Sequence, residues 1–404
     1  MTSSSVASPP RSPFPSARGE LAPSLACAAV LLSLLCAACG DDGAEPTGGG
    51  STSAGAGAGG DGGSGGAWAG CPVGSHETDP RVCVATLGAF SEGPSLAFAR
   101  DHHVTWISTR PSGTYLYAAA GGEDMTTQVR SIERSPIAAD GSLGPWETIT
   151  GDPNTSGPIL ATTDDTVIFA GGYRGLAQAT RTVDVYAIDD AGEMVGPTAG
   201  PLMIDTRFHG AGVLVNGWVY ATGGVDVTGT SLQTVERAQL GPGTLGAWVA
   251  DTPMLDRRSH HGLATDGKHL FATGGLERIE NDFGNDTPRT DVLRTTVLED
   301  GSLGPWESIS TLPEPIAVHS SFVHAGQLYI VSGLHMDSSH FTESVSRATI
   351  ADDGSLGAWE TLPVELPMAR GHTHQTPMHQ GILYSVAGHD HGMSQIEVFF
   401  ARFE

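Results

Sequence analysis

One octapeptide, Asp-Gly-Ser-Leu-Gly-Pro-Trp-Glu, constrains the fold more than any other feature of this sequence. It occupies residues 140–147 and 300–307, and residues 353–360 repeat it with alanine in place of proline. A looser copy lies at residues 243–248, so the copies are about fifty residues apart. This period is typical of the blades of a β-propeller rather than of helical hairpins.

Composition supports an all-β chain and limits its partners. Among 404 residues there are 55 glycines and 25 prolines, which favour many turns between short strands over long helices. The 20 basic and 45 acidic residues give a formal net charge of −25, which repels a polyanion such as nucleic acid. We therefore expect no nucleic-acid partner, whereas cationic ligands and divalent metals are better tolerated.

The first seventy residues carry targeting signals. An apolar run at residues 25–38 is too short to span a bilayer but fits the core of a signal peptide. It ends before Cys39 in a segment that resembles the bacterial lipoprotein signal, in which such a cysteine is lipidated. We predict a signal peptide over residues 1–38 and lipidation of Cys39, with ordinary cleavage after an Ala-x-Ala-like site as the alternative.

The segment at residues 39–70 is rich in glycine, serine and alanine and is predicted to be a flexible tether. Membrane contact is then expected only through the lipid anchor, on the periplasmic or surface face of the outer membrane. Beyond Cys39 only Cys71 and Cys83 remain, and in an oxidising compartment such a pair is expected to form a disulfide. Two free thiols that bind a metal are the alternative.

Six strands end in a pair of small residues, and each follows a run of aromatic and branched residues typical of a buried strand. The glycines of these pairs allow backbone turns at which a Cβ atom would clash. The six pairs are Gly121-Gly122, Gly171-Gly172, Gly223-Gly224, Gly274-Gly275, Ser332-Gly333 and Ala387-Gly388. A strand with a recurrent arginine follows four of them, and the octapeptide tryptophan comes eleven or twelve residues after that arginine.

This order of elements resembles the kelch repeat over residues 87–404. Blade 2 departs from the pattern, because Thr198 stands in place of the tryptophan. The resemblance implies an all-β, six-bladed kelch-type β-propeller over residues 71–404, which we expect to be a monomer.

Closure of the ring is predicted from spacing. His261, His319 and His372 each lie thirteen residues after a tryptophan, and counting back thirteen from His103 reaches Phe90. The segment Leu-Gly-Ala-Phe at residues 87–90 echoes Leu-Gly-Ala-Trp at residues 356–359. Because the last repeat has no outer strand of its own, we expect the segment around Phe90 to supply it.

Recurrent histidines and arginines open the first strand of most blades. The histidines are His103, His209, His261, His319 and His372, and the arginines are Arg100, Arg207, Arg258 and Arg370. A side chain that recurs in most blades is most simply explained by hydrogen bonds to the backbone of a neighbouring blade, so we interpret the histidines as structural.

Loops that differ between blades are the predicted binding site. In a propeller the loops after the small-residue pairs and the starts of the first strands lie at the same end, so they are expected to surround the channel mouth. The predicted ligand-binding residues are Arg100, Glu123, Arg174, Arg207, Asp226, Arg258, His335, Arg370 and His389.

Two of these loops contain groups that bind metals in other proteins. His389 and His391, with His372, His374, His335 and His340 nearby in the repeats, form a candidate imidazole site. A loop at residues 281–286 offers oxygen ligands for calcium, although it lacks the pattern of a helical calcium loop. No cofactor is expected.

Three functions follow from the resemblance. The first is a non-catalytic protein that binds a small polar ligand, a glycan or a protein at the channel mouth. The second is a periplasmic carbohydrate isomerase, because one group of six-bladed kelch proteins interconverts anomers of sialic acid. The copper-radical galactose oxidases need a core cysteine, and residues 85–404 contain none. This third chemistry is therefore excluded unless Cys71 or Cys83 reaches the channel.

Overall fold

The computed structural model describes residues 70–79, 82–123, 127–174, 178–280, 282, 285–390 and 393–404. These residues form strands, turns and loops and no helix. No helix in this part of the chain is therefore long and apolar enough to cross a membrane. The predicted signal peptide, Cys39 and nearly all of the tether lie outside the described residues.

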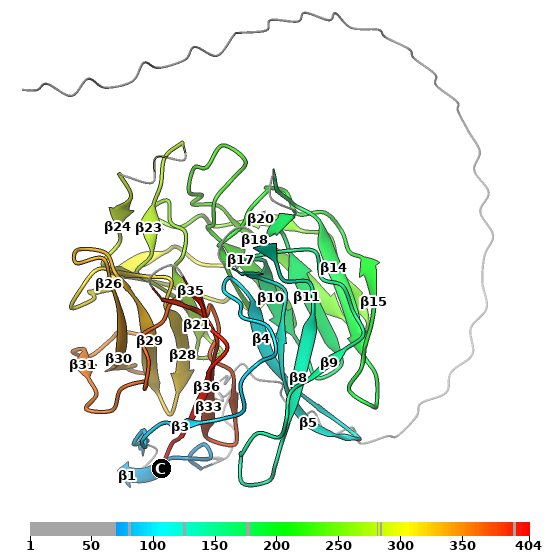
Figure 1. Ribbon diagram of the computed structural model, residues 1–404. Helices are drawn as coiled ribbons and strands as arrows, with labels where there is room; N and C mark the ends of the chain where they lie inside the picture. Colours follow the sequence, from blue (N-terminus) through cyan, green and yellow to red (C-terminus); the bar gives the residue numbers. More distant parts are fainter. Residues whose placement is uncertain are drawn as a thin grey trace, which may run out of the picture. The chain divides into compact units, whose positions relative to one another are not determined.

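Six antiparallel sheets follow one another along the chain and surround a common axis (Figure 1). Blade 1 comprises β4 (Val104–Arg110), β5 (Gly113–Ala119), β8 (Ile132–Ile137) and β9 (Glu147–Ile149). Blade 2 comprises β10 (Ile159–Thr162), β11 (Thr166–Ala170), β14 (Val183–Ile188) and β15 (Met194–Ala199). Blade 3 comprises β16 (Ala211–Val215), β17 (Trp218–Thr222), β18 (Val235–Gly241) and β20 (Val249–Asp251), with β19 (Thr244–Leu245) also paired to β18.

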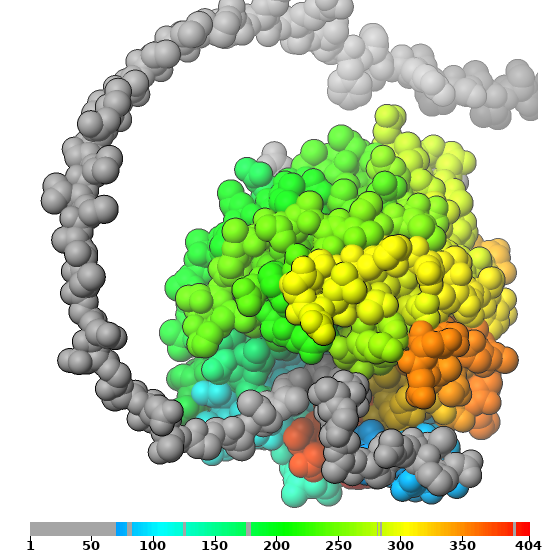
Figure 2. Space-filling view, turned by 180° about the vertical axis from the view of Figure 1, so that it is seen from behind, coloured from blue at the N-terminus to red at the C-terminus, as the bar shows by residue number. Residues whose placement is uncertain are grey.

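The second half of the ring has the same order of strands. Blade 4 comprises β21 (Gly262–Thr265), β22 (His269–Thr273), β25 (Asp291–Thr296) and β26 (Glu307–Thr311). Blade 5 comprises β27 (Ile316–Ala317), β28 (Ser320–His324), β29 (Gln327–His335), β30 (His340–Thr349) and β31 (Glu360–Thr361). Blade 6 comprises β32 (Met378–His379), β33 (Ile382–Val386), β36 (Val398–Arg402) and β3 (Ser91–Glu92). Figure 2 shows consecutive blades packed side by side, from green through yellow to orange.

Short hairpins extend from the main sheets. Four of them follow small-residue pairs: β6 (Gly122–Glu123) with β7 (Thr127–Gln128), β12 (Tyr173–Arg174) with β13 (Gln178–Ala179), β23 (Leu276–Glu277) with β24 (Thr287–Pro288), and β34 (His389–Asp390) with β35 (Met393–Ser394). A fifth, β1 (His76–Asp79) with β2 (Val82–Val84), precedes blade 6's outer strand. Cys71 and Cys83 form a disulfide beside this hairpin.

The N-terminal strand β3 pairs with β36 and completes blade 6, as predicted. Leu87 bridges Phe403 in the same way that the octapeptide leucines Leu143 and Leu303 bridge their own blades. Leu87 and Phe403 are both buried in one hydrophobic cluster. The prediction of a six-bladed propeller closed by an N-terminal strand is therefore confirmed, although the paired strand begins one residue after Phe90.

The octapeptide turns of blades 1 and 4 link these blades to the preceding ones. The Tyr384 hydroxyl of blade 6 donates to the Gly141 carbonyl of blade 1 at 2.8 Å, and Tyr220 of blade 3 donates to Gly301 of blade 4 at 2.6 Å. The strand-three arginine of blade 3, Arg237, donates to the carbonyl of Asp300 in the same turn of blade 4. The repeat is thus maintained by contacts between blades.

Two closed rings of backbone hydrogen bonds hold the blades around the axis. One residue per blade, the residue that turns into the first strand, forms the inner ring, and we call these six the axial residues: His102, Gly157, His209, His260, Val318 and His372. Each donates its amide to the carbonyl of the preceding axial residue at 2.7–3.1 Å, and the His102 amide closes the ring on His372. All six have a φ angle between 49° and 58°.

The second ring explains the small-residue pairs. The amides of Gly121, Gly172, Gly224, Gly275, Gly333 and Gly388 each donate to a carbonyl of the next blade at 2.8–3.1 Å. The preceding residue also has a positive φ, and at Gly171 and Gly274 a Cβ atom would overlap the carbonyl oxygen of the next blade. In blade 1 the equivalent pair is Ala120 and Gly121, so the predicted pair Gly121-Gly122 is wrong by one residue.

Candidate functional site

A central channel of about 680 Å³ runs along the axis, surrounded by the innermost strands of all six blades. Each of these strands is the last in its sheet, so its outer edge of amides and carbonyls faces the channel. In blade 6 this edge continues into the preceding loop, where the Gln375 amide oxygen accepts a hydrogen bond from the Thr105 amide at 3.2 Å. The channel wall therefore offers hydrogen-bonding groups between apolar side chains, which make up the larger part of the lining surface.

Side chains in the channel lining are mostly uncharged. The described lining contains the carboxylate of Asp164 and several histidines, but neither arginine nor lysine. Trp106 and Phe322 add aromatic surface beside the polar strand edges. At the end of the channel where the first strand of each blade turns into the second, Pro72 and Val73 of the N-terminal segment also line the channel.

Imidazoles gather at the opposite end, where the first strands begin. The rings of His102 and His372 lie with their centroids 3.9 Å apart, and those of His209 and His260 lie 4.3 Å apart. His102 stacks on His209 at 4.2 Å. These four are axial residues from blades 1, 3, 4 and 6, and they separate the channel from the loops that follow the small-residue pairs.

Burial and mutual repulsion keep three of these imidazoles neutral. Burial is the main cause that lowers the pKa of His209, His260 and His372 well below the usual value, and the His102 ring lowers it further. Burial is the largest single influence on the pKa of Asp101 and would raise it, but the hydrogen bond and charge of His102, the hydrogen bond from Ser394 and the charge of His389 together lower the pKa. The bond from the His102 Nδ1 atom is 2.7 Å long. The carboxylate is thus ionised and orients His102.

Sequence reasoning did not separate two kinds of recurrent histidine. His209 and His372 are axial, whereas His103, His261 and His319 lie one position further along the chain and point between blades. The Nε2 atoms of His261 and His319 lie 2.8 Å from the hydroxyls of Thr222 and Thr273 on the preceding blade. The structural interpretation holds for these two, although the partner is a threonine side chain rather than backbone. The spacing Arg-x-His in blades 1, 3, 4 and 6 was the signal that identifies the axial histidines.

The four recurrent arginines do not face the mouth. Arg100, Arg207, Arg258 and Arg370 are fully buried within their own blades. Arg100 binds the carboxylate of Glu133 at 2.6 Å, and Arg258 binds Asp291 at 2.8 Å. Each also donates to a carbonyl at the end of the second strand, such as Ala120 or Gly274. Arg370 donates only through Nη1, to backbone carbonyls, and its Nε and Nη2 atoms have no hydrogen-bond partner within the described part of the chain. Because all four guanidinium groups are enclosed within their own blades, the structure places them in the scaffold rather than in the predicted ligand site.

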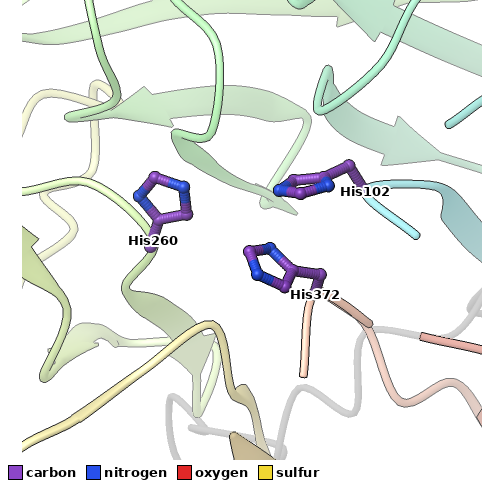
Figure 3. A group of neighbouring side chains, drawn as sticks. All are labelled: His102, His260 and His372. Carbon is purple, nitrogen blue, oxygen red and sulfur yellow. The ribbon is translucent and has the colours of Figure 1, made fainter. Parts of the chain in front are cut away.

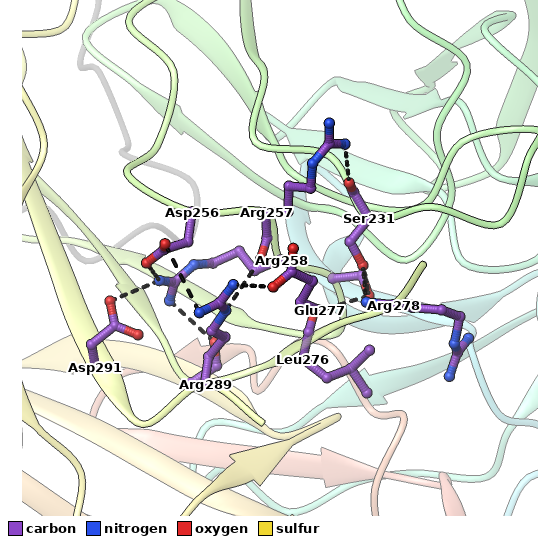
Figure 4. A network of polar contacts seen from close by, with 11 residues as sticks. Ser231, Asp256, Arg257, Arg258, Leu276, Glu277, Arg278, Arg289 and Asp291 are labelled. Carbon is purple, nitrogen blue, oxygen red and sulfur yellow. Dashed lines mark hydrogen bonds and ion pairs between the residues drawn. The ribbon is translucent and has the colours of Figure 1, made fainter. Parts of the chain in front are cut away.

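Polar networks connect the blades near these arginines. In Figure 4 Arg258 lies between Asp256 and Asp291, and Arg289 reaches Glu277 of β23. The Arg257 side chain donates to the Ser231 carbonyl of blade 3 at 2.9 Å. These contacts fix the loops of blades 3 and 4 to one another.

The remaining predicted loop residues lie around the mouth but are held within separate loops. Arg174 forms an ion pair with Asp184, and the His335 Nδ1 atom lies 2.5 Å from the Glu314 carboxylate. Asp226 accepts the amides of Thr228 and Thr230 in its own turn. Glu123 is exposed on β6.

His389 is the predicted loop residue that lies beside the axial histidines. Its ring centroid is 5.6 Å from that of His372. His391, the second residue of the candidate metal site, lies outside the described residues, as do parts of the predicted calcium loop at residues 281–286.

Comparisons with known proteins agree with this architecture. No protein-family model matches the chain. Beta-scruin of Limulus polyphemus is 25% identical over 138 residues, which is 33% of this chain and only 14% of the length of Beta-scruin. The solved structure described as "Structure of YjhT" superposes with a TM-score of 0.59 at 13% identity and covers 76% of this chain and 95% of that one. This likeness shows the fold, and the chain is accordingly a six-bladed β-propeller.

Proposed function

We propose that this protein binds a small, polar, uncharged molecule of the size of a mono- or disaccharide inside its central channel. The observation that carries the proposal is the channel itself, whose volume of about 680 Å³ lies in the range of small-molecule sites. Its wall is formed by the innermost strands of the six blades, whose edges offer amides and carbonyls to hydroxyl groups.

The chemistry of the lining favours a neutral ligand over an anionic one. A carboxylate ligand is best bound by a charged donor such as arginine, and the described lining provides neither arginine nor lysine. The apolar residues of the lining and the amide of Gln375 fit a polyhydroxylated ring that has one polar edge and one apolar face. This argument disfavours an acidic sugar as the ligand and therefore weakens the isomerase alternative drawn from the kelch resemblance.

A binding screen with neutral sugars and other small polyols tests the proposal. The substitution Gln375→Leu keeps the side-chain volume but removes the amide, and Thr162→Trp fills the channel next to Asp164. Both are expected to weaken binding of a hit at least about tenfold, which corresponds to about 1.4 kcal/mol. The matched control is Arg174→Ala on the rim, which leaves channel binding unchanged.

The opposite pattern would contradict a channel site. If Arg174→Ala or a substitution of His335 abolished binding while Thr162→Trp had no effect, the ligand would bind the mouth loops. Turnover of the hit, followed by NMR of the sugar anomers, would instead favour the isomerase.

Export and lipid anchoring are a further part of the proposal. The Cys71–Cys83 disulfide supports an oxidising compartment, and the sequence before Cys39 resembles a lipoprotein signal. Labelling with a radioactive fatty acid in a bacterial host is expected to mark the wild-type protein and not Cys39→Ser. Equal labelling of both proteins would disprove an anchor at Cys39.

A further inference from the structure

Three of the axial histidines direct ring nitrogens toward one point. His102, His260 and His372 each offer a nitrogen atom, and these three atoms all lie within 4.8 Å of one another. Figure 3 shows the three rings facing a shared space, although they come from blades 1, 4 and 6. Three imidazoles from distant parts of the sequence therefore meet at the closed end of the channel.

The propeller scaffold does not by itself require imidazoles at these positions. The inner hydrogen-bond ring is made by backbone atoms, and Gly157 and Val318 occupy two of its six positions with the same left-handed conformation. Histidine tolerates this conformation better than most residues, but asparagine and glycine do so equally well. Packing alone thus leaves unexplained why the side chains that meet here are histidines.

Neighbouring polar groups orient two of the rings. The His102 Nδ1 atom lies 2.7 Å from the Asp101 carboxylate, and the His260 Nδ1 atom lies 3.0 Å from the Ser259 hydroxyl. Asp101 is itself held by the Ser394 hydroxyl at 2.9 Å. A carboxylate that accepts the Nδ1 proton leaves the Nε2 lone pair free, which is the arrangement found behind metal-binding histidines.

The third ring carries an unsatisfied nitrogen. The Nδ1 atom of His372 is buried and has no hydrogen-bond partner among the described residues, and the same is true of His209 Nδ1. Buried polar atoms without partners are uncommon in folded proteins, and coordination of an ion satisfies such an atom. His372 itself is only partly buried, so an ion has access to the cluster.

We propose that His102, His260 and His372 bind one divalent first-row transition-metal ion, of which Zn²⁺ is the simplest example. Zinc–imidazole bonds of about 2.0–2.1 Å place the nitrogens of a tetrahedral site about 3.3 Å apart, so small rotations of the rings complete the site. Three neutral imidazoles leave a coordination position for water or for a channel ligand. The net charge of −25 and the ionised Asp101 compensate the added positive charge.

Direct metal titration tests this site without any sugar. The full chain is purified without a polyhistidine tag, stripped with a chelator and titrated with Co²⁺ and then Zn²⁺. We expect one equivalent of Co²⁺ to produce the visible absorption of a four- or five-coordinate imidazole site, and Zn²⁺ to displace it. We also expect saturating Zn²⁺ to raise the melting temperature, because a ligand that binds only the folded state stabilises it.

Substitutions by asparagine keep the left-handed backbone while removing the imidazole. His102→Asn, His260→Asn and His372→Asn are each expected to lower the Co²⁺ affinity at least tenfold, and the triple variant to lose the absorption. Asp101→Asn removes no metal ligand but is expected to weaken binding by about 10–100-fold, as the loss of an orienting carboxylate does elsewhere. The matched control, His335→Asn with His340→Asn, removes two histidines of the loops and leaves binding unchanged.

The proposal has clear opposite outcomes. If the wild-type protein binds no metal, the proposal is overturned. Equal metal binding by the triple variant also overturns it, because the metal would then be held by groups present in both proteins, such as the thiols of Cys27, Cys36 and Cys39. If the triple variant does not fold, the wild-type spectrum and the effect of Asp101→Asn decide. Loss of metal binding in a variant that still binds the sugar, or loss of sugar binding in a variant that still binds the metal, shows that the metal site and the channel ligand can fail independently.

Discussion

Individual residues in this propeller are explained by what they contact in the adjacent blade. The histidines that follow the axial residues illustrate this. His319, which follows Val318, is 1% exposed and lies 2.8 Å from the Thr273 hydroxyl of blade 4. Burial lowers the pKa of His319 to about 3. The folded protein therefore holds this imidazole neutral, while the unfolded chain protonates it near pH 6.5.

This difference predicts a pH-dependent stability. Between about pH 6.5 and pH 3 the unfolded state binds one more proton at this position, so the unfolding free energy falls as the pH falls. At pH 4.5 proton uptake by the unfolded state at His319 lowers the free energy of unfolding by about 2–3 kcal/mol relative to neutral pH. Urea unfolding at several pH values in this range gives the slope of the unfolding free energy against pH. We expect this slope to correspond to about one proton fewer in His319→Gln than in the wild type. The exposed His76→Gln serves as control, and an unchanged slope in His319→Gln would contradict the assignment.

The buried arginines predict a second residue-scale effect. Glu236 is 1% exposed and accepts Arg207 at 2.6 Å together with the amides of Ile204 and Asp205. Arg207→Met leaves this carboxylate without its counter-charge and is expected to cost about 3–5 kcal/mol in chemical unfolding. Arg130→Met breaks the exposed pair with Asp152 and is expected to cost about 0–1 kcal/mol. A stable Arg207→Met protein that loses ligand binding would return this arginine to the ligand site.

At the scale of elements, the turn after each second strand determines how closely two blades approach. The first residue of each small-residue pair adopts a positive φ, and its neighbour donates an amide to the next blade. Glycine serves here for two separate reasons, the backbone conformation and the lack of space for a Cβ atom.

A pair of substitutions separates these two reasons. Gly274 and Gly243 have similar φ angles of 53° and 65°, but a Cβ atom at Gly274 would overlap the Ile316 carbonyl, whereas nothing lies within 4 Å at Gly243. Gly243→Ala is expected to cost about 1–2 kcal/mol through backbone strain alone. Gly274→Ala is expected to cost at least about 2 kcal/mol more, because blade 5 must move. Equal melting temperatures for the two variants would show that close approach is unimportant.

For the whole molecule, the closing strand joins the two ends of the described chain. Leu87, β3 and the partly buried Phe90 cover Phe403 and β36, so the outer edge of β36 is paired. Such closure depends on contacts of high sequence separation, which form late and slowly.

Truncation tests the closure. Deletion of residues 1–92 removes the outer strand of blade 6 and is expected to cost about 5 kcal/mol or more, which corresponds to a fall in melting temperature of about 7 °C or more. Deletion of residues 1–69 removes no described residue and is the matched control, for which the expected melting temperature equals that of the intact chain. Coincident melting of the two truncated proteins would contradict the role of β3.

The sequence by itself determined the number of blades and the closing segment, because both rest on a pattern with a fixed spacing. It also determined the disulfide pair, because only Cys71 and Cys83 remain beyond Cys39. The echo of the octapeptide at residues 87–90 located the missing strand, and the tertiary contact of Leu87 with Phe403 matches it. The local sequence was sufficient here because equivalent packing contacts recur in every blade.

Only the tertiary structure decided which of two adjacent histidines faces the axis. His102 and His103, like His260 and His261, differ by one position. The first of each pair lies in the inner amide ring at the axis, whereas the His261 side chain reaches the Thr222 hydroxyl of the neighbouring blade and also lines the channel. The same applies to Arg100 and Arg207, whose charge suggested the mouth but whose buried acidic partners lie about thirty residues further along the chain. A side chain's direction depends on a register that closes only when all six blades meet, and no segment of the sequence contains that information alone.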